Sequence, residues 1–191
     1  MAKLYFRYSS MNAGKSLELI STHYNYLELG KNPVAYVPNI SGNTIRSRVG
    51  CEIEAIPFDK DFRFNLDNIM VNHCDCILID EAQFLTREQV IELHKLTAMQ
   101  AIPVICYGLR TDFRGEPFEG SGMLLALADE LQELPTLCHC GKKARMVLRT
   151  VNDKVITEGE QVAIKDTNDK IKYYSVCSRH FYLRKPCKEV E

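Results

Sequence analysis

A stretch of eight residues between two apolar segments constrains the fold of this chain most strongly. Residues 9–16 read Ser-Ser-Met-Asn-Ala-Gly-Lys-Ser, after a strand-like run and before a helix-like one. A tight turn with a glycine before a helix can direct backbone amides at anionic oxygens. Lys15 would then reach the outer phosphates of a nucleotide, and the Ser16 hydroxyl would contact Mg²⁺. The stretch therefore predicts a phosphate-binding loop.

One position of this loop departs from the usual pattern G-x-x-x-x-G-K-[ST]. Ser9 stands where the first glycine is usual. Serine tolerates turn geometry, and Gly14, Lys15 and Ser16 retain the lysine and magnesium contacts. The alternative is a chance Gly-Lys-Ser triplet before a helix, because short motifs carry a false-positive risk.

Strand and helix patterns alternate from residue 3 to about residue 134. We expect strands at 3–8, 34–37, 76–79 and 104–107, and helices at 15–29, 86–99 and 121–133. Thr86 and Gln89 would form a T-x-x-Q capping box for the second helix, and Ser121 would cap the third. The apolar residues expected to face inward from the first helix are Leu17, Ile20, Tyr24 and Leu27. This alternation predicts an open, mostly parallel P-loop-type sheet with helices on both faces and a ligand site at the carboxyl ends of the strands.

The pattern changes after Pro135, where short β-like runs and a Cys/His cluster replace the alternation. We therefore expect two domains. The first, residues 1–134, would be a P-loop ATP-binding α/β domain. The second, residues 135–191, would be a small zinc-binding β domain.

A pair of carboxylates forms the second half of the predicted site. Asp80 and Glu81 directly follow the apolar run 76–79. Asp80 is placed to organise Mg²⁺ through bound water, and Glu81 is free to accept a proton from an acceptor hydroxyl. The alternative is a solvated helix cap, which adjacent acidic residues after a strand often form.

Two loops add candidate ligand contacts. Arg46 and Arg48 lie in a polar segment that extends to Gly50, which we expect to be a mobile loop. They could contact phosphate or could be solvated surface arginines. Phe113 and Phe118 lie in a long loop after the strand at 104–107. Their flat rings would suit a nucleobase, or they could simply anchor the loop to the core.

Cysteine and histidine side chains near the end of the chain have the spacing of a structural zinc site. Cys138 and Cys140 form a C-x-C pair, and Cys177 and His180 form C-x-x-H. The first pair is one residue shorter than the usual knuckle, so His139 or Cys187 could substitute. Buried free thiols are the alternative.

Charge and hydropathy narrow the class of protein. The chain carries 24 Lys+Arg against 25 Asp+Glu, which gives no basic field for a nucleic-acid backbone. No apolar run approaches the roughly 20 residues of a membrane span, and the N-terminus leads into a strand rather than a signal peptide. We expect a soluble, cytoplasmic protein with small-molecule partners. Asp80-Glu81-Ala82-Gln83 also fits a helicase-type box, so an ATPase stimulated by nucleic acid is the rival interpretation.

Taken together and in order, these motifs resemble those of type II thymidine kinases. The resemblance covers nearly the whole chain. It rests on the loop 9–16, Asp80-Glu81-Ala82-Gln83-Phe84, the loop 111–118, Cys140-Gly141-Lys142-Lys143-Ala144, and Ser175-Val176-Cys177 with His180. It implies a P-loop fold followed by a zinc ribbon whose lasso loop closes over the nucleoside. It also implies transfer of the γ-phosphate of ATP to the 5′-hydroxyl of thymidine, with deoxyuridine as a second candidate substrate.

The resemblance implies roles for individual residues. Glu81 would be the general base. The ATP and magnesium set would be Ser9, Ser10, Met11, Asn12, Ala13, Gly14, Lys15, Ser16, Asp80 and Gln83. The thymine pocket would consist of Met11, Leu109, Phe113, Phe118 and Tyr173. A homotetramer and inhibition by thymidine triphosphate are also implied.

Three features depart from the family pattern. The C-x-C pair at Cys138 and Cys140 replaces C-x-x-C. Residues 165–170 stand where a short Gly-Gly turn is usual, so no amide of that segment is assigned to the base. The family's arginine after the second strand corresponds to either Arg46 or Arg48.

Overall fold

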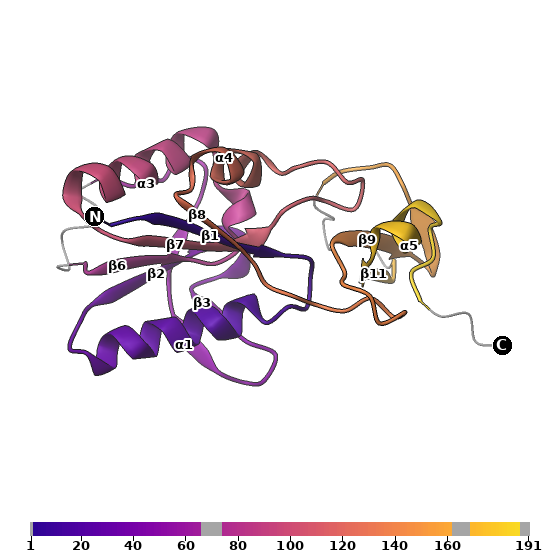
Figure 1. Cartoon of the computed structure of the whole chain (residues 1–191), viewed down its shortest axis with the longest axis horizontal. Helices are drawn as coiled ribbons and strands as arrows, with labels where there is room; N and C mark the ends of the chain where they lie inside the picture. The colour runs from indigo at the N-terminus through magenta and orange to yellow at the C-terminus, as the bar shows by residue number, and fades with distance from the viewer. Residues whose placement is uncertain (1, 66–73, 162–168, 188–191) are drawn as a thin grey trace.

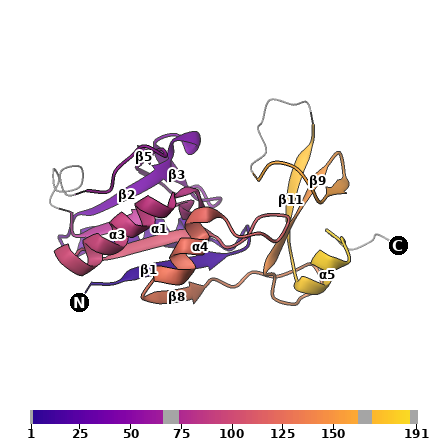
Figure 2. The same ribbon diagram turned by 90° about the horizontal axis from the view of Figure 1, so that it is seen from above.

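The computed structural model describes residues 2–65, 74–161 and 169–187. A six-stranded sheet with helices on both faces forms the larger part, and a three-stranded sheet with one short helix lies beside it (Figures 1 and 2). The predicted α/β class is therefore confirmed. No helix in the described ranges is long and apolar enough to cross a membrane.

The elements follow one another as strands and helices up to residue 133, and mainly as strands thereafter. In the first part they are β1 Leu4–Ser9, α1 Lys15–Glu28, β2 Pro33–Pro38, η1 Asn39–Ser41, β3 Thr44–Arg46, β4 Glu52–Glu54, β5 Ile56–Phe58, β6 Cys76–Ile79, η3 Ala82–Phe84, α3 Arg87–Gln100, β7 Val104–Leu109, α4 Glu119–Leu127 and β8 Glu130–Glu133. In the second part they are β9 Met146–Val151, β10 Lys154–Ile156, β11 Ile171–Val176 and α5 Ser178–Tyr182.

The order of strands in the large sheet brings the predicted site together. The order is β5-β2-β6-β7-β1-β8, and every pairing is parallel. Strands β6, β7 and β1 are therefore neighbours, with Ser9 of β1 opposite Leu109 of β7. Because parallel strands end at the same edge, the phosphate loop, the Asp80-Glu81 pair and the residues after β7 share one crevice.

The two faces of this sheet bury different helices. Leu19 and Ile20 of α1 pack with Leu78, Ile105 and other buried residues on one face. Residues of α3 and α4 pack on the other face with residues that include Leu4, Phe6, Ile77 and Ile79. The short apolar strands are thus covered on both sides, as expected of a parallel sheet.

The inward face of the first helix was predicted wrongly. Of the four residues expected inward only Ile20 is buried, together with Leu19, whereas Leu17, Tyr24 and Leu27 are exposed. A helix that covers one sheet face buries only the side directed at the strands. The periodic pattern contained two apolar stripes, and the sheet covers the one that includes Leu19.

The helix expected at 121–133 is also shorter than predicted. Helix α4 begins at Glu119 and ends at Leu127, and residues 130–133 form β8. Ser121 does not cap it; the Ser121 hydroxyl donates to the carbonyl of Leu109. The side-chain carboxylate of Asp129 accepts a hydrogen bond from the backbone amide of Leu4. The backbone amide of Asp129 donates to the carbonyl of Leu4. Pairing with the free edge of β1 satisfies backbone groups that another helical turn would leave open.

The structure confirms one further local prediction and differs from another. Thr86 and Gln89 form the predicted capping box at the start of α3. The polar segment after β2 is more ordered than a plain loop, because η1 and β3 form within it and β3 pairs with β4.

Candidate functional site

The loop between β1 and α1 has the conformation that the phosphate-loop motif requires. Gly14 precedes the helix with φ of 80° and ψ of 17°, and Asn12 also has a positive φ of 68°. Only glycine adopts such angles without steric cost, which explains the glycine at position 14. Met11, Asn12, Ala13, Gly14, Lys15 and Ser16 all line one cavity of about 380 Å³.

The two serines that begin the motif accept hydrogen bonds from Lys15. The Lys15 ammonium donates to Oγ of Ser9 and to the carbonyl of Ser10, each at 3.1 Å. All three residues are buried. Burial lowers the pKa of Lys15, and the negative charges of Glu81 and Asp80 offset part of this effect. Ser9, the one departure from the motif, thus supplies a hydroxyl that a glycine could not.

The buried Asp80 is hydrogen-bonded to Ser16, which lines the cavity. The Ser16 hydroxyl donates to Oδ2 of Asp80 at 2.9 Å, and the amide of Glu81 donates to Oδ1 at 3.0 Å. Burial, followed by the charge of Glu81, raises the pKa of Asp80 to about 6. Oxygen ligands of this kind suit Mg²⁺, and a cation here would favour the charged carboxylate.

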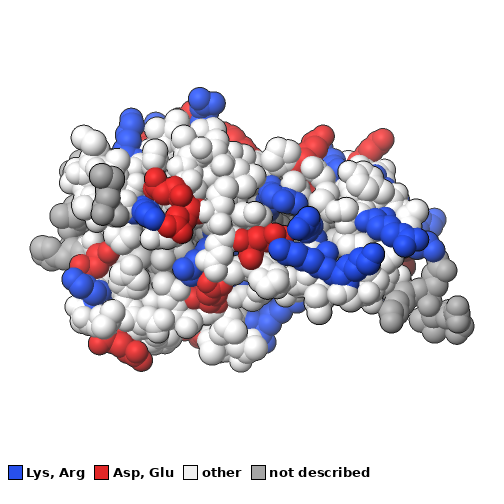
Figure 3. All heavy atoms as spheres, viewed as in Figure 1, with Lys and Arg blue, Asp and Glu red and all other residues white. Residues whose placement is uncertain are grey.

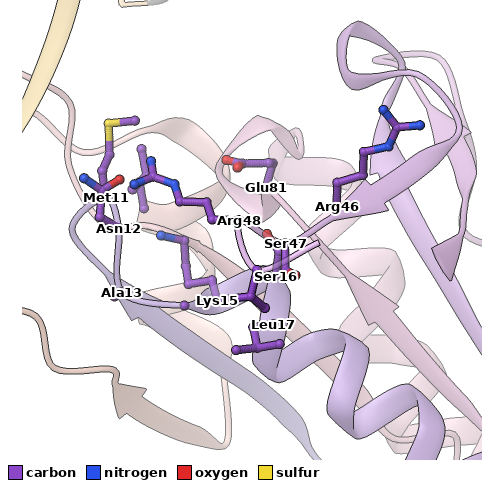
Figure 4. A pocket seen from close by; sticks show the side chains of 13 residues that line it. Met11, Asn12, Ala13, Lys15, Ser16, Leu17, Arg46, Ser47, Arg48 and Glu81 are labelled. Atoms are coloured by element: carbon purple, nitrogen blue, oxygen red, sulfur yellow. The ribbon is translucent and has the colours of Figure 1, made fainter. Parts of the chain in front are cut away.

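The structure distinguishes the two arginines that the sequence left open. Arg46 forms an exposed ion pair with Glu52 at 2.7 Å. Arg48 extends toward the phosphate loop above Lys15, whereas Arg46 points away from it (Figure 4). Both residues line the same cavity, but only Arg48 is directed at its interior.

Glu81 has an unusual backbone conformation. Its φ of 50° and ψ of 41° lie in the left-handed region, which is costly for a residue with a side chain. This turn separates Glu81 from Asp80, so that the adjacent carboxylates serve different positions. Glu81 lines the 380 Å³ cavity, and it also lines a second cavity of about 170 Å³.

Gln83 holds the Glu81 carboxylate in place. Its amide nitrogen donates to Oε2 of Glu81, and its Oε1 accepts from the amide of Leu109 at 3.0 Å. Gly108 makes this possible, because a Cβ at that position would lie 2.9 Å from the same Oε1. These contacts favour a positioning role for Gln83 in place of the direct ATP or magnesium contact inferred from the sequence.

The second cavity gathers the predicted pocket residues. Phe113 and Phe118 are only 2% and 6% exposed, so they both anchor the loop and form part of the cavity wall. The lining consists of Met11, Glu81, Gln83, Phe84, Leu109, Thr111, Asp112, Phe113, Phe118, Val147, Gln161 and Tyr173. Met11, Glu81 and Leu109 line both cavities, so the two are neighbours.

The small sheet contributes one wall of this cavity. Val147 and Tyr173 come from the paired strands β9 and β11, and the Ser175 hydroxyl donates to the carbonyl of Met11 at 2.6 Å. The sequence did not single out Val147 or Gln161, since no local motif marks residues that only tertiary contacts assemble. Thr111 and Asp112 belong to the loop 111–118, but the sequence assigned them no contact with the base.

The four expected zinc ligands converge. The ligand atoms of Cys138, Cys140, Cys177 and His180 all lie within 4.8 Å of one another. The Sγ atoms of Cys140 and Cys177 are 3.8 Å apart, close to the roughly 3.8 Å that two thiolates have at tetrahedral Zn²⁺. The C-x-C turn closes through Gly141, whose φ is 81°.

The two possible substitutes lie outside this group of four. The His139 ring stacks on His180 with centroids 4.2 Å apart. Cys187 is exposed. The residues thus fit a structural zinc ion without either substitute.

Comparison with known proteins identifies relatives over nearly the full length. A family model described as thymidine kinase matches residues 2–181. A thymidine kinase of Shewanella oneidensis is 48% identical over 191 residues, with 95% of this chain and 97% of that protein covered. A thymidine kinase of Vibrio vulnificus is 47% identical over 189 residues, with 95% and 97% covered. A thymidine kinase of Rhodopirellula baltica is 49% identical over 189 residues, with 95% and 88% covered.

Proposed function

The chain belongs to the thymidine kinase family, an ATP-dependent phosphotransferase family, and from this premise we propose how its two cavities divide the reaction. The 380 Å³ cavity takes the ATP phosphates, and the 170 Å³ cavity takes thymidine. The observation that carries this division is the position of Glu81, which lines both. A general base must lie within hydrogen-bond reach of the proton that it accepts. A residue that lines both cavities can meet this requirement.

The donor half rests on the phosphate loop. Backbone amides of residues 11–16 and the Lys15 ammonium bind the phosphates. Ser16 and Asp80 would hold Mg²⁺, which would supply positive charge to stabilise the transferred phosphoryl group. The raised pKa of Asp80 and the lowered pKa of Lys15 agree with this role, because both side chains are buried where ligands of opposite charge would compensate them.

The acceptor half rests on Glu81 and the apolar pocket. The 5′-oxygen of thymidine attacks the γ-phosphorus, the bond from that phosphorus to the bridging oxygen of ADP breaks, and the hydroxyl proton passes to the Glu81 carboxylate. Gln83 keeps this carboxylate oriented. Met11, Leu109, Phe113, Phe118 and Tyr173 enclose the base.

Arg48, and not Arg46, is the arginine that we expect to contact ATP phosphate. Arg48→Ala should raise the KM for ATP about tenfold, because a charge-assisted contact is lost. Arg46→Ala is the matched control and should leave the KM within about twofold, since its partner is Glu52 at the surface. Steady-state kinetics at saturating thymidine measure both. Equal effects of the two substitutions would contradict the assignment.

Phosphate transfer itself tests the proposed function. With γ-labelled ATP, label should appear on thymidine, and a panel of nucleosides should include deoxyuridine. A missing methyl group is worth only about 1 to 3 kcal/mol, so deoxyuridine is expected to react less efficiently. Release of phosphate that single-stranded DNA stimulates, without transfer to any nucleoside, would instead support the rival ATPase.

The formal net charge of −1 argues against that rival, because a nucleic-acid motor needs a basic binding surface. On the face shown in Figure 3, Lys and Arg gather over the small sheet, while the half with the large sheet carries both signs. No basic track crosses both halves on this face. A motor that grips a nucleic-acid strand needs such a track.

Further proposals rest on the family. We propose a boundary near residue 134 between the two domains, structural zinc at the Cys138 cluster, a cytoplasmic location and inhibition by thymidine triphosphate. A homotetramer is also proposed. It is supported by α1, where Tyr24 and Leu27 are exposed apolar side chains on one side of the helix and could pack against another subunit. Residues 165–168, part of the expected lasso, lie outside the described residues.

A further inference from the structure

We propose that Arg149 is a positioning residue for the nucleoside pocket. Its guanidinium connects the ring of Phe113 to the segment 158–161. The inference rests on the proposed function, because it assigns the 170 Å³ cavity to thymidine. Arg149 does not line that cavity. It contacts Phe113, which does line it, and the carbonyl of Glu160, the residue before Gln161, which also lines it.

The guanidinium of Arg149 covers one face of Phe113. Its central carbon lies 3.6 Å from the ring centroid, and the residue is 6% exposed. A desolvated guanidinium over an aromatic face is attracted by the quadrupole of the ring. The guanidinium therefore fixes one face of the Phe113 ring, and the remaining surface of the ring contributes to the cavity wall.

The same guanidinium holds the segment that follows β10. Its Nη1 donates to the carbonyl of Glu160 at 2.8 Å, and its Nη2 approaches the carbonyl of Glu158 at 3.4 Å. Gly159, between them, has φ of 115°, and a Cβ there would lie 2.9 Å from Nη2. The turn therefore closes over the guanidinium only with glycine at this position.

A second contact connects this segment to the loop of Phe113. The side-chain amide nitrogen Nε2 of Gln161 donates to Oδ2 of Asp112 at 3.3 Å. The buried Asp112 carboxylate also accepts from the amides of Arg114 and Glu116, at 2.8 and 3.0 Å. The loop that presents Phe113 and the segment that presents Gln161 are thus joined twice, once through Asp112 and once through Arg149.

The environment of Arg149 is poorly suited to a purely stabilising role. None of the ion pairs found across residues 2–65, 74–161 and 169–187 involves Arg149, and its buried Nε has no hydrogen-bond partner there. A buried charge without a counter-charge is costly for folding. Such local conflicts are expected at functional sites, where positioning is gained at the expense of stability.

Arg149→Met should raise the KM for thymidine about 10- to 30-fold, with the KM for ATP within about twofold. Arg149→Lys should not restore it, because an ammonium cannot stack and donate to two carbonyls at once. Gly159→Ala should shift the same constant in the same direction. The matched controls are Arg145→Met, at an exposed arginine before β9, and Gly30→Ala, at a glycine with positive φ and no neighbour within 4 Å.

A change confined to the KM for thymidine separates positioning from general destabilisation, which would affect both substrates. An unchanged KM for thymidine in a folded Arg149→Met protein would overturn the inference, as would an equal rise in the KM for ATP. If Arg149→Met does not fold, Gly159→Ala decides in the same way. If the unmodified chain does not phosphorylate thymidine, the proposed function itself is refuted.

Discussion

Replacement of Glu81 by glutamine should lower kcat by about two to four orders of magnitude. The amide keeps the size of the side chain but cannot accept the proton of the 5′-hydroxyl. Thymidine binding should survive, because the apolar walls of the pocket are unchanged. Single-turnover transfer of label from ATP to thymidine, with thymidine affinity measured separately, checks both parts.

A matched control is Glu28→Gln, an exposed glutamate at the end of α1, which should leave kcat unchanged. Near-normal turnover in Glu81→Gln would remove Glu81 from the role of base. A large loss of thymidine affinity with unchanged kcat would indicate instead that Glu81 mainly binds the nucleoside.

Loss of the proposed zinc ion should have the second large effect. The purified protein should contain about one zinc ion per chain, and Cys140→Ser should reduce this strongly. Strand β11 leads directly into Cys177 and carries both Tyr173 and Ser175. Without the metal we expect the small sheet to lose order and activity to fall roughly 100-fold or more.

Cys140 suits this test because it is exposed, so serine removes a metal ligand without opening a cavity in the core. Cys51→Ser is the matched control, since Cys51 is exposed and lies outside the cluster. Zinc content, thermal unfolding and the KM for thymidine should all remain normal in the control. A zinc-free Cys140→Ser protein that folds and binds thymidine equally well would refute the structural role.

Sequence patterns predicted the elements whose signals are local. The strand before the phosphate loop, the buried strand before Asp80 and the capping box at Thr86 are all present. Each depends on neighbouring residues alone: an apolar run, a turn glycine, or a Thr and Gln spaced to satisfy helix amides. The four residues of the Cys/His cluster were also found, because metal ligands have distinctive spacing.

Predictions failed where the partner of a segment lies far away in sequence. The residues after Leu127 continue a helical pattern, yet the open edge of β1 binds 130–133 as a strand. Helix α1 carries two apolar stripes, and only the position of the sheet decides which one is buried. The contacts of Gln83 with Glu81 and with the amide of Leu109 also have no sequence signal, because Leu109 lies 26 positions away along the chain.

By itself, the sequence determined that this protein has a phosphate loop, a pair of carboxylates after a buried strand and a zinc-type cluster. Those features are set by residue type and spacing over a few positions. Only the tertiary structure decided that Glu81 lines two neighbouring cavities, that Arg48 rather than Arg46 is directed at the phosphate loop, and that Arg149 packs on Phe113. Such arrangements depend on which strand ends become neighbours, and the strand order β6-β7-β1 brings together residues up to about 100 positions apart.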